Sequence, residues 1–181
     1  MKNRLRETWN SGKPALNGWL GIPSTFSAEI MSKQDFDSIT IDLQHGLTDY
    51  SIAVPMMQAM SASDATMLCR VPWLEAGIIM KLLDAGAMGI ICPMINSRKE
   101  AEEFVGATRY APLGYRSSGP VRAGIIYPDY HNQANDQIIS MAMIETEEAV
   151  ANAEEICATP GLTGIYVGPS DLAISMGEGP G

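Results

Sequence analysis

Six short apolar runs alternate with helical patterns along the chain, and this rhythm constrains the fold more than any other feature of the sequence. Turn residues bound the runs, which lie near residues 17–21, 38–42, 65–70, 88–94, 139–145 and 162–168. Most of them are too continuously apolar for a sheet with one face in water, so we expect both faces to be covered. Strands separated by helices in this way predict repeated βα units around a parallel sheet.

Helical patterns fill the intervals between these runs, near residues 3–11, 25–34, 48–62, 74–85, 97–109 and 146–158. The clearest helix start is Ser97, because Glu100 follows three residues later and the pair predicts a capping box. Segment 110–137 breaks the rhythm, since it is rich in Gly, Pro and Tyr and is too long for an ordinary connection. We interpret it as a functional or interface loop.

Two architectures contain such a series of βα units: a doubly wound open sheet and the first three quarters of an eight-stranded barrel. The doubly wound fold expects a Gly-rich phosphate-binding turn after its first strand. The sequence at that point is GWLGIPSTFS, which contains neither G-x-G-x-x-G nor a P-loop. We therefore predict an α/β fold of the (β/α)8 TIM-barrel type, incomplete here, with one domain over residues 1–181 that is truncated after the sixth strand.

Composition argues against several classes of partner. Twelve Lys and Arg against 21 Asp and Glu give a net charge of -9, the wrong sign for binding a nucleic-acid backbone. The three cysteines lack C-x-x-C spacing, which argues against a disulfide scaffold or structural zinc site and favours a reducing compartment. The apolar runs are short and none follows the charged start, so we expect no membrane partner and a cytoplasmic location.

Polar side chains lie at the ends of four predicted strands, where the reactive groups of a βα barrel collect. Asp42 ends the second strand with His45 three residues on, Arg70 ends the third, Glu145 ends the fifth, and the sixth leads to Asp171. Charged groups are seldom buried without a partner. Their position at four strand ends therefore predicts a site at this edge of the sheet.

Glu145 and Asp171 are the candidate metal ligands. Two carboxylates without a nearby His or Cys form an oxygen-rich site that suits Mg²⁺ or Mn²⁺ better than zinc. The alternative is structural: Asp171 and Ser170 cap the next helix, and Glu145 pairs with an arginine. The segment Gly168-Pro169-Ser170-Asp171 also opens a helix, whose N–H groups are candidates to hold a substrate carboxylate.

Arg70, His45 and Asp42 are the candidate catalytic groups. Arg70 is either a member of a structural ion pair or a permanent cation directed at an oxyanion. Asp42 is spaced to orient the His45 imidazole as a general base, although an isolated D-x-x-H is frequent. Trp19, at the end of the first strand, is either a pocket wall or a core residue.

Other mechanisms lack their nucleophile. The five lysines all fall at the N-terminus or on predicted helices, so Schiff-base chemistry has no candidate at a strand end; they are Lys2, Lys13, Lys33, Lys81 and Lys99. No G-x-S-x-G elbow is present for Ser-His-Asp hydrolysis. Any enolate chemistry is therefore expected to be metal-assisted.

Taken in order, several motifs resemble the HpcH/HpaI aldolase family over essentially the whole chain: IDLQHG, CRVP, LLDAGAMGIICPM, TRYAPLGYRSSGPVR, MIET and VGPSDL. The resemblance implies a (β/α)8 barrel that uses Mg²⁺, Mn²⁺ or Co²⁺ and a homo-oligomer, a hexamer in the family. It implies reversible cleavage of a 4-hydroxy-2-oxo acid to pyruvate and an aldehyde through a metal-stabilised pyruvate enolate.

The resemblance also implies residue roles. Glu145 and Asp171 would be metal ligands, Arg70 would stabilise the enolate, and His45 with Asp42 would form the acid–base dyad. Backbone N–H groups of the turn 168–171 would receive the pyruvate carboxylate.

Three departures from the family pattern bear on these roles. Gln44 stands where many members have Glu, and Met143 stands where some have a substrate-bonding Gln, which puts the substrate preference in doubt. The chain also stops short of the roughly 250 residues that such a barrel needs. Two alternatives stay open: a metal-enolate decarboxylase or carbon–carbon bond-forming enzyme resembling macrophomate synthase, and an inactive, truncated assembly subunit.

Overall fold

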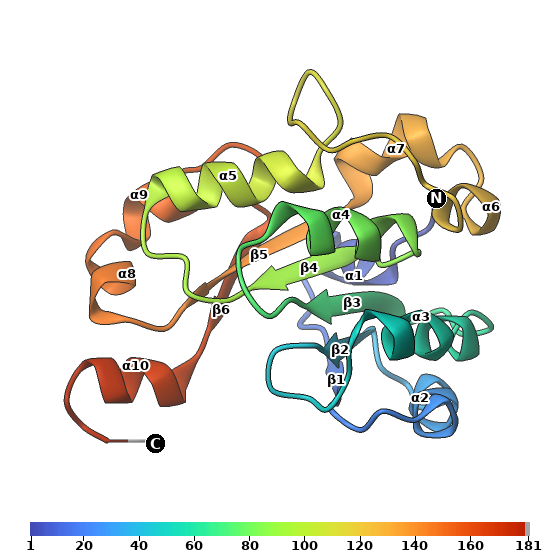
Figure 1. The fold of residues 1–181 in the computed structure, drawn as a ribbon, viewed down its shortest axis with the longest axis horizontal. Helices are drawn as coiled ribbons and strands as arrows, with labels where there is room; N and C mark the ends of the chain where they lie inside the picture. The colour runs from blue at the N-terminus through green and yellow to red at the C-terminus, as the bar shows by residue number, and fades with distance from the viewer. Residues whose placement is uncertain (180–181) are drawn as a thin grey trace.

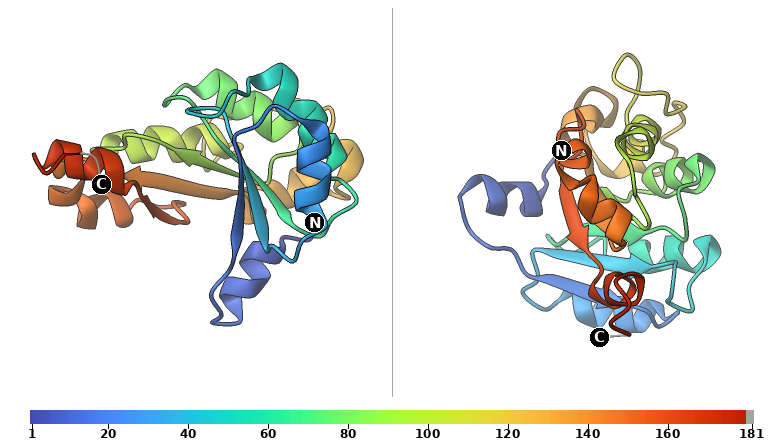
Figure 2. Two further views of the ribbon diagram at one scale, coloured as in Figure 1. Left: turned by 90° about the horizontal axis from the view of Figure 1, so that it is seen from below. Right: turned by 90° about the vertical axis from the view of Figure 1, so that its left-hand side faces the viewer.

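A computed structural model describes residues 1–179; residues 180 and 181, the last two of the predicted domain, lie outside the described residues. Six parallel strands form one sheet in the order β1-β2-β3-β4-β5-β6. They are β1 (Asn17–Leu20), β2 (Ser38–Asp42), β3 (Thr66–Arg70), β4 (Gly89–Cys92), β5 (Ile139–Ile144) and β6 (Gly164–Val167). The sheet curls from β1 to β6 into an incomplete barrel (Figures 1 and 2), which confirms the predicted fold class.

The helices follow the predicted alternation. They are α1 (Arg4–Asn10), α2 (Thr25–Ser32), α3 (Tyr50–Ala59), α4 (Ala76–Asp84), α5 (Arg98–Thr108), α6 (Ala123–Ile126), α7 (Tyr130–Gln137), α8 (Glu147–Ala151), α9 (Ala153–Cys157) and α10 (Pro169–Ser175). The hydroxyl of Ser97 accepts a hydrogen bond from the N–H of Glu100, and the Glu100 carboxylate accepts one from the N–H of Asn96. Both hydrogen bonds cap the amino terminus of α5. The predicted helix 146–158 is divided into α8 and α9 at Asn152.

Alternation along the strands divides the core into two layers. Ile39 and Ile41 of β2 are fully buried in the larger cluster, which lies between the sheet and its helices. Leu68 of β3 and Ile139 of β5 belong to a second cluster on the inner face of the sheet, together with Leu5 of α1. Helix α1 therefore packs on the inner side of the curve, apart from the other helices (Figure 2).

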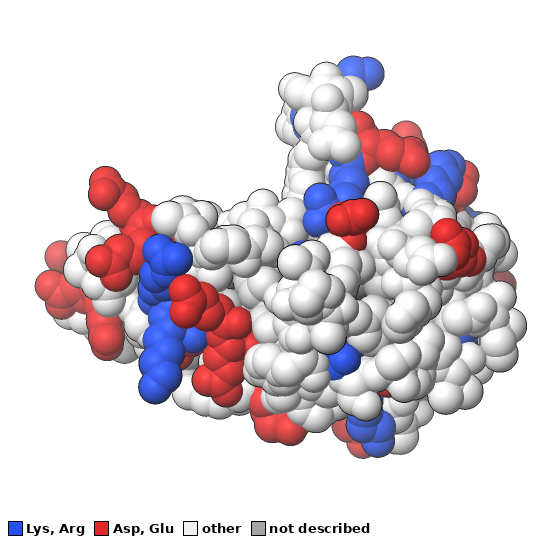
Figure 3. Space-filling view, turned by 90° about the horizontal axis from the view of Figure 1, so that it is seen from above, with Lys and Arg blue, Asp and Glu red and all other residues white. Residues whose placement is uncertain are grey.

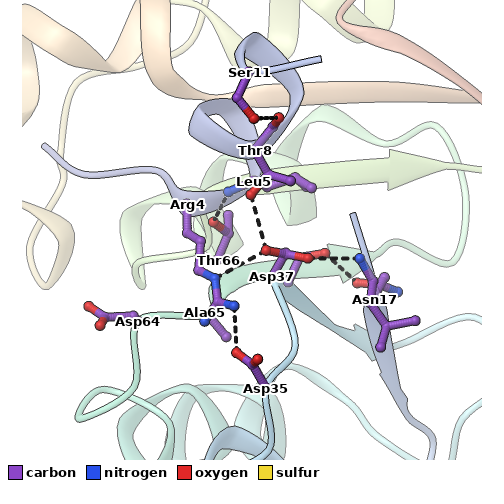
Figure 4. A network of polar contacts seen from close by, with 12 residues as sticks. Arg4, Leu5, Thr8, Ser11, Asn17, Asp35, Asp37, Asp64, Ala65 and Thr66 are labelled. Atoms are coloured by element: carbon purple, nitrogen blue, oxygen red, sulfur yellow. Dashed lines mark hydrogen bonds and ion pairs between the residues drawn. The ribbon is translucent and has the colours of Figure 1, made fainter. Parts of the chain in front are cut away.

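Polar contacts fix α1 at the amino ends of the strands (Figure 4). The Leu5 N–H donates to the Thr66 hydroxyl at 3.0 Å, within buried surroundings. Arg4 donates to Asp37 at 3.1 Å and to Asp35 at 2.7 Å, just before β2. These contacts cover the amino ends of β2 and β3, whereas the predicted site residues lie at the carboxyl ends of the strands.

The prediction that both faces of the sheet are covered is wrong for β6. Its residues alternate between half-buried and exposed, and Ile165 and Val167 are 37% and 53% exposed. Tyr166, between them, lies on the inner face with Trp19 of β1 at a ring-centroid distance of 5.7 Å. An apolar run indicates a strand but does not establish that both of its faces are packed.

Segment 110–137 is more ordered than a loop. It contains α6 and α7, and Tyr130 at the start of α7 is buried. The fully buried Arg116 side chain donates to Asp84 at 2.7 Å and to the Tyr130 hydroxyl at 2.9 Å. Much of the segment is therefore part of the packed structure, which an excess of Gly and Pro did not indicate.

No helix within residues 1–179 is both long and apolar enough to cross a bilayer. On the face shown in Figure 3, acidic and basic side chains are interspersed and do not form a continuous basic surface.

Candidate active site

The ends of β2 and β3 place Asp42 beside Arg70. The two residues are partners in the parallel register, so their side chains emerge at the same level of the sheet. Arg70 donates from Nε to Oδ1 of Asp42 at 2.8 Å and from Nη2 to Oδ2 at 2.6 Å. Their side chains are 12% and 5% exposed. This is a two-point ion pair, the geometry that best fixes a guanidinium plane.

The Asp42 carboxylate has further donors. Its Oδ1 accepts the backbone N–H groups of Gln44 at 3.0 Å and His45 at 3.3 Å. Burial on its own would raise the pKa of Asp42, but the hydrogen bonds and charge of Arg70 and the Gln44 N–H outweigh it and hold that pKa below its ordinary value of 3.8. Asp42 is therefore an anion throughout the neutral range.

Trp19 of β1 packs beside this ion pair. Its indole Nε1 donates to Oδ2 of Asp42 at 3.3 Å, and the Arg70 guanidinium carbon lies 5.0 Å from the ring centroid. An aromatic face near a guanidinium adds a cation–π attraction. Trp19 is neither a pure core residue nor a detached pocket wall, because it contacts both members of the pair.

Glu145 follows β5 directly and is buried, with 1% of the residue exposed. Its Oε1 accepts the backbone N–H of Met94 at 2.7 Å. Burial raises the pKa of Glu145 above 4.5, the Met94 N–H opposes this, and the negative charge of Asp171 raises the pKa further. Arg70 and His45 act on this pKa in the opposite direction. Asp171, Arg70 and His45 are thus all within electrostatic range of Glu145.

A glycine allows Glu145 to lie against the turn before α10. A Cβ on Gly168 would come within 2.4 Å of Oε2 of Glu145 and within 2.9 Å of its Cβ. The N–H of Gly168 donates a hydrogen bond to the carbonyl of Ile144 at 3.2 Å, and Pro169, as a proline, has no backbone N–H. Of the residues 168–171, Ser170 and Asp171 keep N–H groups without a protein acceptor in the described structure.

The residues present fit a hard divalent cation. Glu145 is a buried carboxylate whose charge is disfavoured by desolvation and by the exposed carboxylate of Asp171, and a cation between them would relieve both costs. Within residues 1–179 no cluster contains three or more His, Cys, Asp or Glu side chains suited to a metal. A cation held by these two carboxylates would keep positions for substrate and water.

His45 is exposed and near the site, but Asp42 contacts its backbone rather than its imidazole. No hydrogen bond joins the two side chains in residues 1–179, so the acid–base dyad stays a prediction. Two features near the site were not anticipated from the sequence: the Met94 N–H that binds Glu145, and the buried Oε1 of Gln44, which has no hydrogen-bond partner among residues 1–179. Neither has a residue-type signal, because one is a backbone group and the other depends on packing.

The arrangement brings together an oriented guanidinium, two carboxylates and an imidazole at the carboxyl ends of barrel strands. The model of a family described as HpcH/HpaI aldolase/citrate lyase matches residues 18–179. The chain belongs to this family. The family resemblance predicted from the sequence motifs is confirmed.

Two relatives show the likeness over nearly the whole chain. A hydroxypyruvate/pyruvate aldolase from Rhizorhabdus wittichii is 44% identical over 179 residues, covering 98% of this chain and 71% of that protein. A 4-hydroxy-2-oxo-heptane-1,7-dioate aldolase from Salmonella paratyphi C is 35% identical over 181 residues, covering 98% of this chain and 69% of that protein. The chain is accordingly a carbon–carbon lyase of the aldolase type.

A solved structure shares the fold. The crystal structure of an HpcH/HpaI aldolase/citrate lyase family protein from Burkholderia cenocepacia matches with a TM-score of 0.91 at 29% identity. The match covers 98% of this chain and 73% of that chain. The curled six-stranded sheet is thus the barrel of HpcH/HpaI aldolases over the part that the two chains share.

Proposed function

We propose that this aldolase cleaves a 4-hydroxy-2-oxo acid reversibly to pyruvate and an aldehyde, with Arg70 as the group that stabilises the pyruvate enolate. The observation that carries the proposal is the two-point contact of Arg70 with Asp42 at the strand ends. It uses Nε and Nη2, and Nη1 of Arg70 has no protein acceptor among residues 1–179. Nη1 is therefore the donor available to a substrate oxygen.

Cleavage breaks the C3–C4 bond and leaves its electron pair on the pyruvate fragment as an enolate. Charge develops on the C2 oxygen, where a permanent cation in a half-buried site is most effective. Protonation at C3 then gives pyruvate. Arg70 suits this role because its orientation is fixed before the charge develops, so little reorganisation is needed.

His45 is the group proposed to accept the proton of the C4 hydroxyl. Imidazole is the side chain most often used for general acid–base catalysis, and that of His45 is exposed within electrostatic range of Glu145. In this proposal Asp42 acts on His45 through the 3.3 Å contact with its backbone N–H, which holds the turn after β2. Dyad function would require the imidazole to turn toward the carboxylate.

The turn before α10 is proposed to receive the substrate carboxylate. Ser170 and Asp171 provide N–H groups at a helix start, where partial positive charge accumulates. Trp19 is proposed to limit the pocket on the side of β1, since it lies against Arg70 and Tyr166.

Glu145 and Asp171 are the proposed ligands of the divalent cation. When bound, Mg²⁺, Mn²⁺ or Co²⁺ would act as a Lewis acid toward the 2-oxo acid and offset the carboxylate charges. The Met94 N–H, at 2.7 Å, holds the Glu145 carboxylate in place and favours its ionised form against the effect of burial.

The direct test is release of pyruvate from 4-hydroxy-2-oxo-heptane-1,7-dioate, measured with Mg²⁺, with Mn²⁺, and after chelation. We expect release that requires the metal and is lost in Glu145→Gln but not in Glu148→Gln, which alters an exposed carboxylate on α8. Oxaloacetate is the comparison substrate: decarboxylation without any aldol cleavage would contradict the proposal and favour the decarboxylase alternative.

A homo-oligomer is part of the proposal. Three large apolar side chains are exposed in segments that follow β1, β2 and β3: Ile22 at 65%, Leu47 at 82% and Trp73 at 57%. Exposed apolar groups gathered near a functional rim favour contact with another protein surface. Light scattering after size exclusion tests this, and a monomer at all concentrations would contradict it.

A further inference from the structure

A polar cavity lies at the opposite end of the barrel from the candidate active site. Its volume is about 500 Å³, and it is lined by parts of α1, α5, α7 and the segment that precedes β6. Two arginines line it, Arg6 from α1 and Arg109 at the end of α5. The proposed activity and the site described above use neither of them.

Both guanidinium groups are bound to backbone at the starts of β5 and β6. Arg109 donates to the carbonyls of Ile138 at 3.1 Å and Gly161 at 2.9 Å, and to the hydroxyl of Ser140 at 3.1 Å. Arg6 donates to the same Ile138 carbonyl at 3.0 Å. These bonds hold the two cations in place side by side.

The positive charge of the pair has no matching carboxylate. Arg4, Arg70 and Arg116 each form a salt bridge, whereas Arg6 and Arg109 form none within residues 1–179. Asp136 of α7 lines the cavity, but it is exposed and forms no ion pair with either of them in the described structure.

The electrostatic cost of this arrangement is visible in the pKa of Arg109. Burial, followed by the like charges of Arg6 and Arg116, lowers that pKa to about 10, while the negative charge of Asp136 acts in the opposite direction. The two adjacent guanidinium groups repel each other. They also form a positively charged site in a chain whose net charge is -9. An anion placed between them would remove the repulsion.

Donor groups remain for such an anion. Nε of Arg109 and Nη1 of Arg6 have no protein acceptor among residues 1–179, and neither is among the buried polar atoms sealed from solvent. Apolar side chains form much of the remaining wall, including Val105, Leu113 and Leu162. A ligand that satisfies both would carry an oxyanion on a short organic body.

We propose that this cavity binds a small organic oxyanion, a carboxylate or phosphate compound, through Arg6 and Arg109. The bound anion would lie beneath β5 and β6, the strands whose other ends lead to Glu145 and Asp171. The proposal is independent of the assigned substrate, because it rests on a different cavity.

The test is a titration of the ¹⁵N-labelled chain with inorganic phosphate and, separately, with succinate at constant ionic strength, followed by NMR. We expect saturable shifts of the amides of Gly161 and Thr163 with at least one anion, and the two arms identify which oxyanion chemistry is preferred. Shifts confined to His45 and Ser170 would report binding at the candidate active site and overturn the proposal, as would the absence of saturable shifts with both anions.

Three variants make the test specific. Arg6→Gln should raise the Kd by roughly tenfold, the loss expected for one charge-assisted hydrogen bond. Asp136→Asn should lower the Kd by about threefold, because it removes an exposed negative charge from the cavity wall without any structural contact. Arg98→Gln, an exposed arginine on α5, is the matched control and should leave the Kd unchanged. Equal effects of Arg6→Gln and Arg98→Gln, or weaker binding to Asp136→Asn, would overturn the proposal.

Discussion

Arg70 holds both carboxylate oxygens of Asp42 across the neighbouring strands β3 and β2, at 2.8 Å and 2.6 Å. The pair sits at the last register position of the two strands, so the sheet itself fixes the distance between the two backbones. A guanidinium held at two points cannot rotate, so the direction of its remaining donor, Nη1, is fixed. The same contact therefore stabilises the fold and orients the proposed catalytic cation.

Arg70→Lys separates charge from geometry. Lysine keeps the positive charge but cannot form the two-point contact, so we expect kcat for aldol cleavage to fall by roughly 100-fold, as when one oriented donor to an oxyanion is lost. Circular dichroism should show an unchanged fold. Arg98→Lys, on the exposed face of α5, is the control and should retain full activity; full activity of Arg70→Lys itself would refute the role of orientation.

Asp42→Asn tests the stability of the pair and its pH dependence. Removing one partner of a largely buried ion pair should lower the free energy of unfolding by on the order of 3 kcal/mol at neutral pH. The folded-state pKa of Asp42 lies below 3.8 because Arg70 outweighs the effect of burial. The stabilisation is therefore complete above the unfolded-state pKa and is lost as the pH falls through the lower folded-state value.

Urea unfolding of both proteins between about pH 3 and pH 7 measures this. The difference in free energy between wild type and Asp42→Asn should be constant above about pH 5 and should shrink below about pH 4, where Asp42 begins to take up a proton. A difference that does not vary with pH would mean that the ion pair does not stabilise the folded state.

Gly168→Ala tests the close approach of Glu145 to the turn before α10. The added Cβ would lie 2.4 Å from Oε2 of Glu145, so the carboxylate must leave its position beside Asp171. We expect the affinity for Mn²⁺ to fall by at least roughly tenfold, as for changes that misplace a metal ligand. Gly164→Ala, at the start of β6, is a matched control, because no atom of the described residues lies within 4 Å of a Cβ added there. Isothermal titration should distinguish them, and equal affinities would contradict the assigned geometry.

Metal binding should also stabilise the folded chain. At a Mn²⁺ concentration of about 100 times Kd, the stability should rise by about 2.7 kcal/mol. Asp171→Asn should abolish this rise in thermal unfolding while leaving the metal-free stability nearly unchanged, since Asp171 is exposed. Glu147→Gln on α8 is the control, as another exposed carboxylate. A rise that persists in Asp171→Asn would exclude that residue as a ligand.

The ends of β2, β3 and β5 were predictable because two sequence features coincide there: an apolar run ends, and a charged residue occurs at or directly after its end. The predicted second strand, 38–42, matches β2 at both ends, and Arg70 closes β3 as expected. Glu145 was placed at a strand end and lies directly after β5. Apolar periodicity and the scarcity of charged residues therefore locate the ends of β2, β3 and β5 to within a residue.

The contacts within the site were not predictable in the same way. The spacing of Asp42 and His45 allowed a local dyad but said nothing of Arg70, whereas the register of β2 against β3 pairs Asp42 with Arg70, 28 residues away. Register depends on packing over the whole sheet, which a local motif does not contain. Likewise, burial of Arg116 between Tyr110 and Tyr130 stabilises a segment whose composition indicated a loop.

The most direct test of the account is exchange of the pyruvate methyl protons with deuterated water, followed by NMR with Mg²⁺ and then with chelator. It requires no knowledge of the aldehyde, because it reports enolate formation alone. We predict exchange in the wild type that stops on chelation and falls by roughly 100-fold in Arg70→Lys. A folded chain that binds the metal but exchanges no protons, or exchanges them equally fast without Arg70, would contradict the claim that this site forms and stabilises the pyruvate enolate.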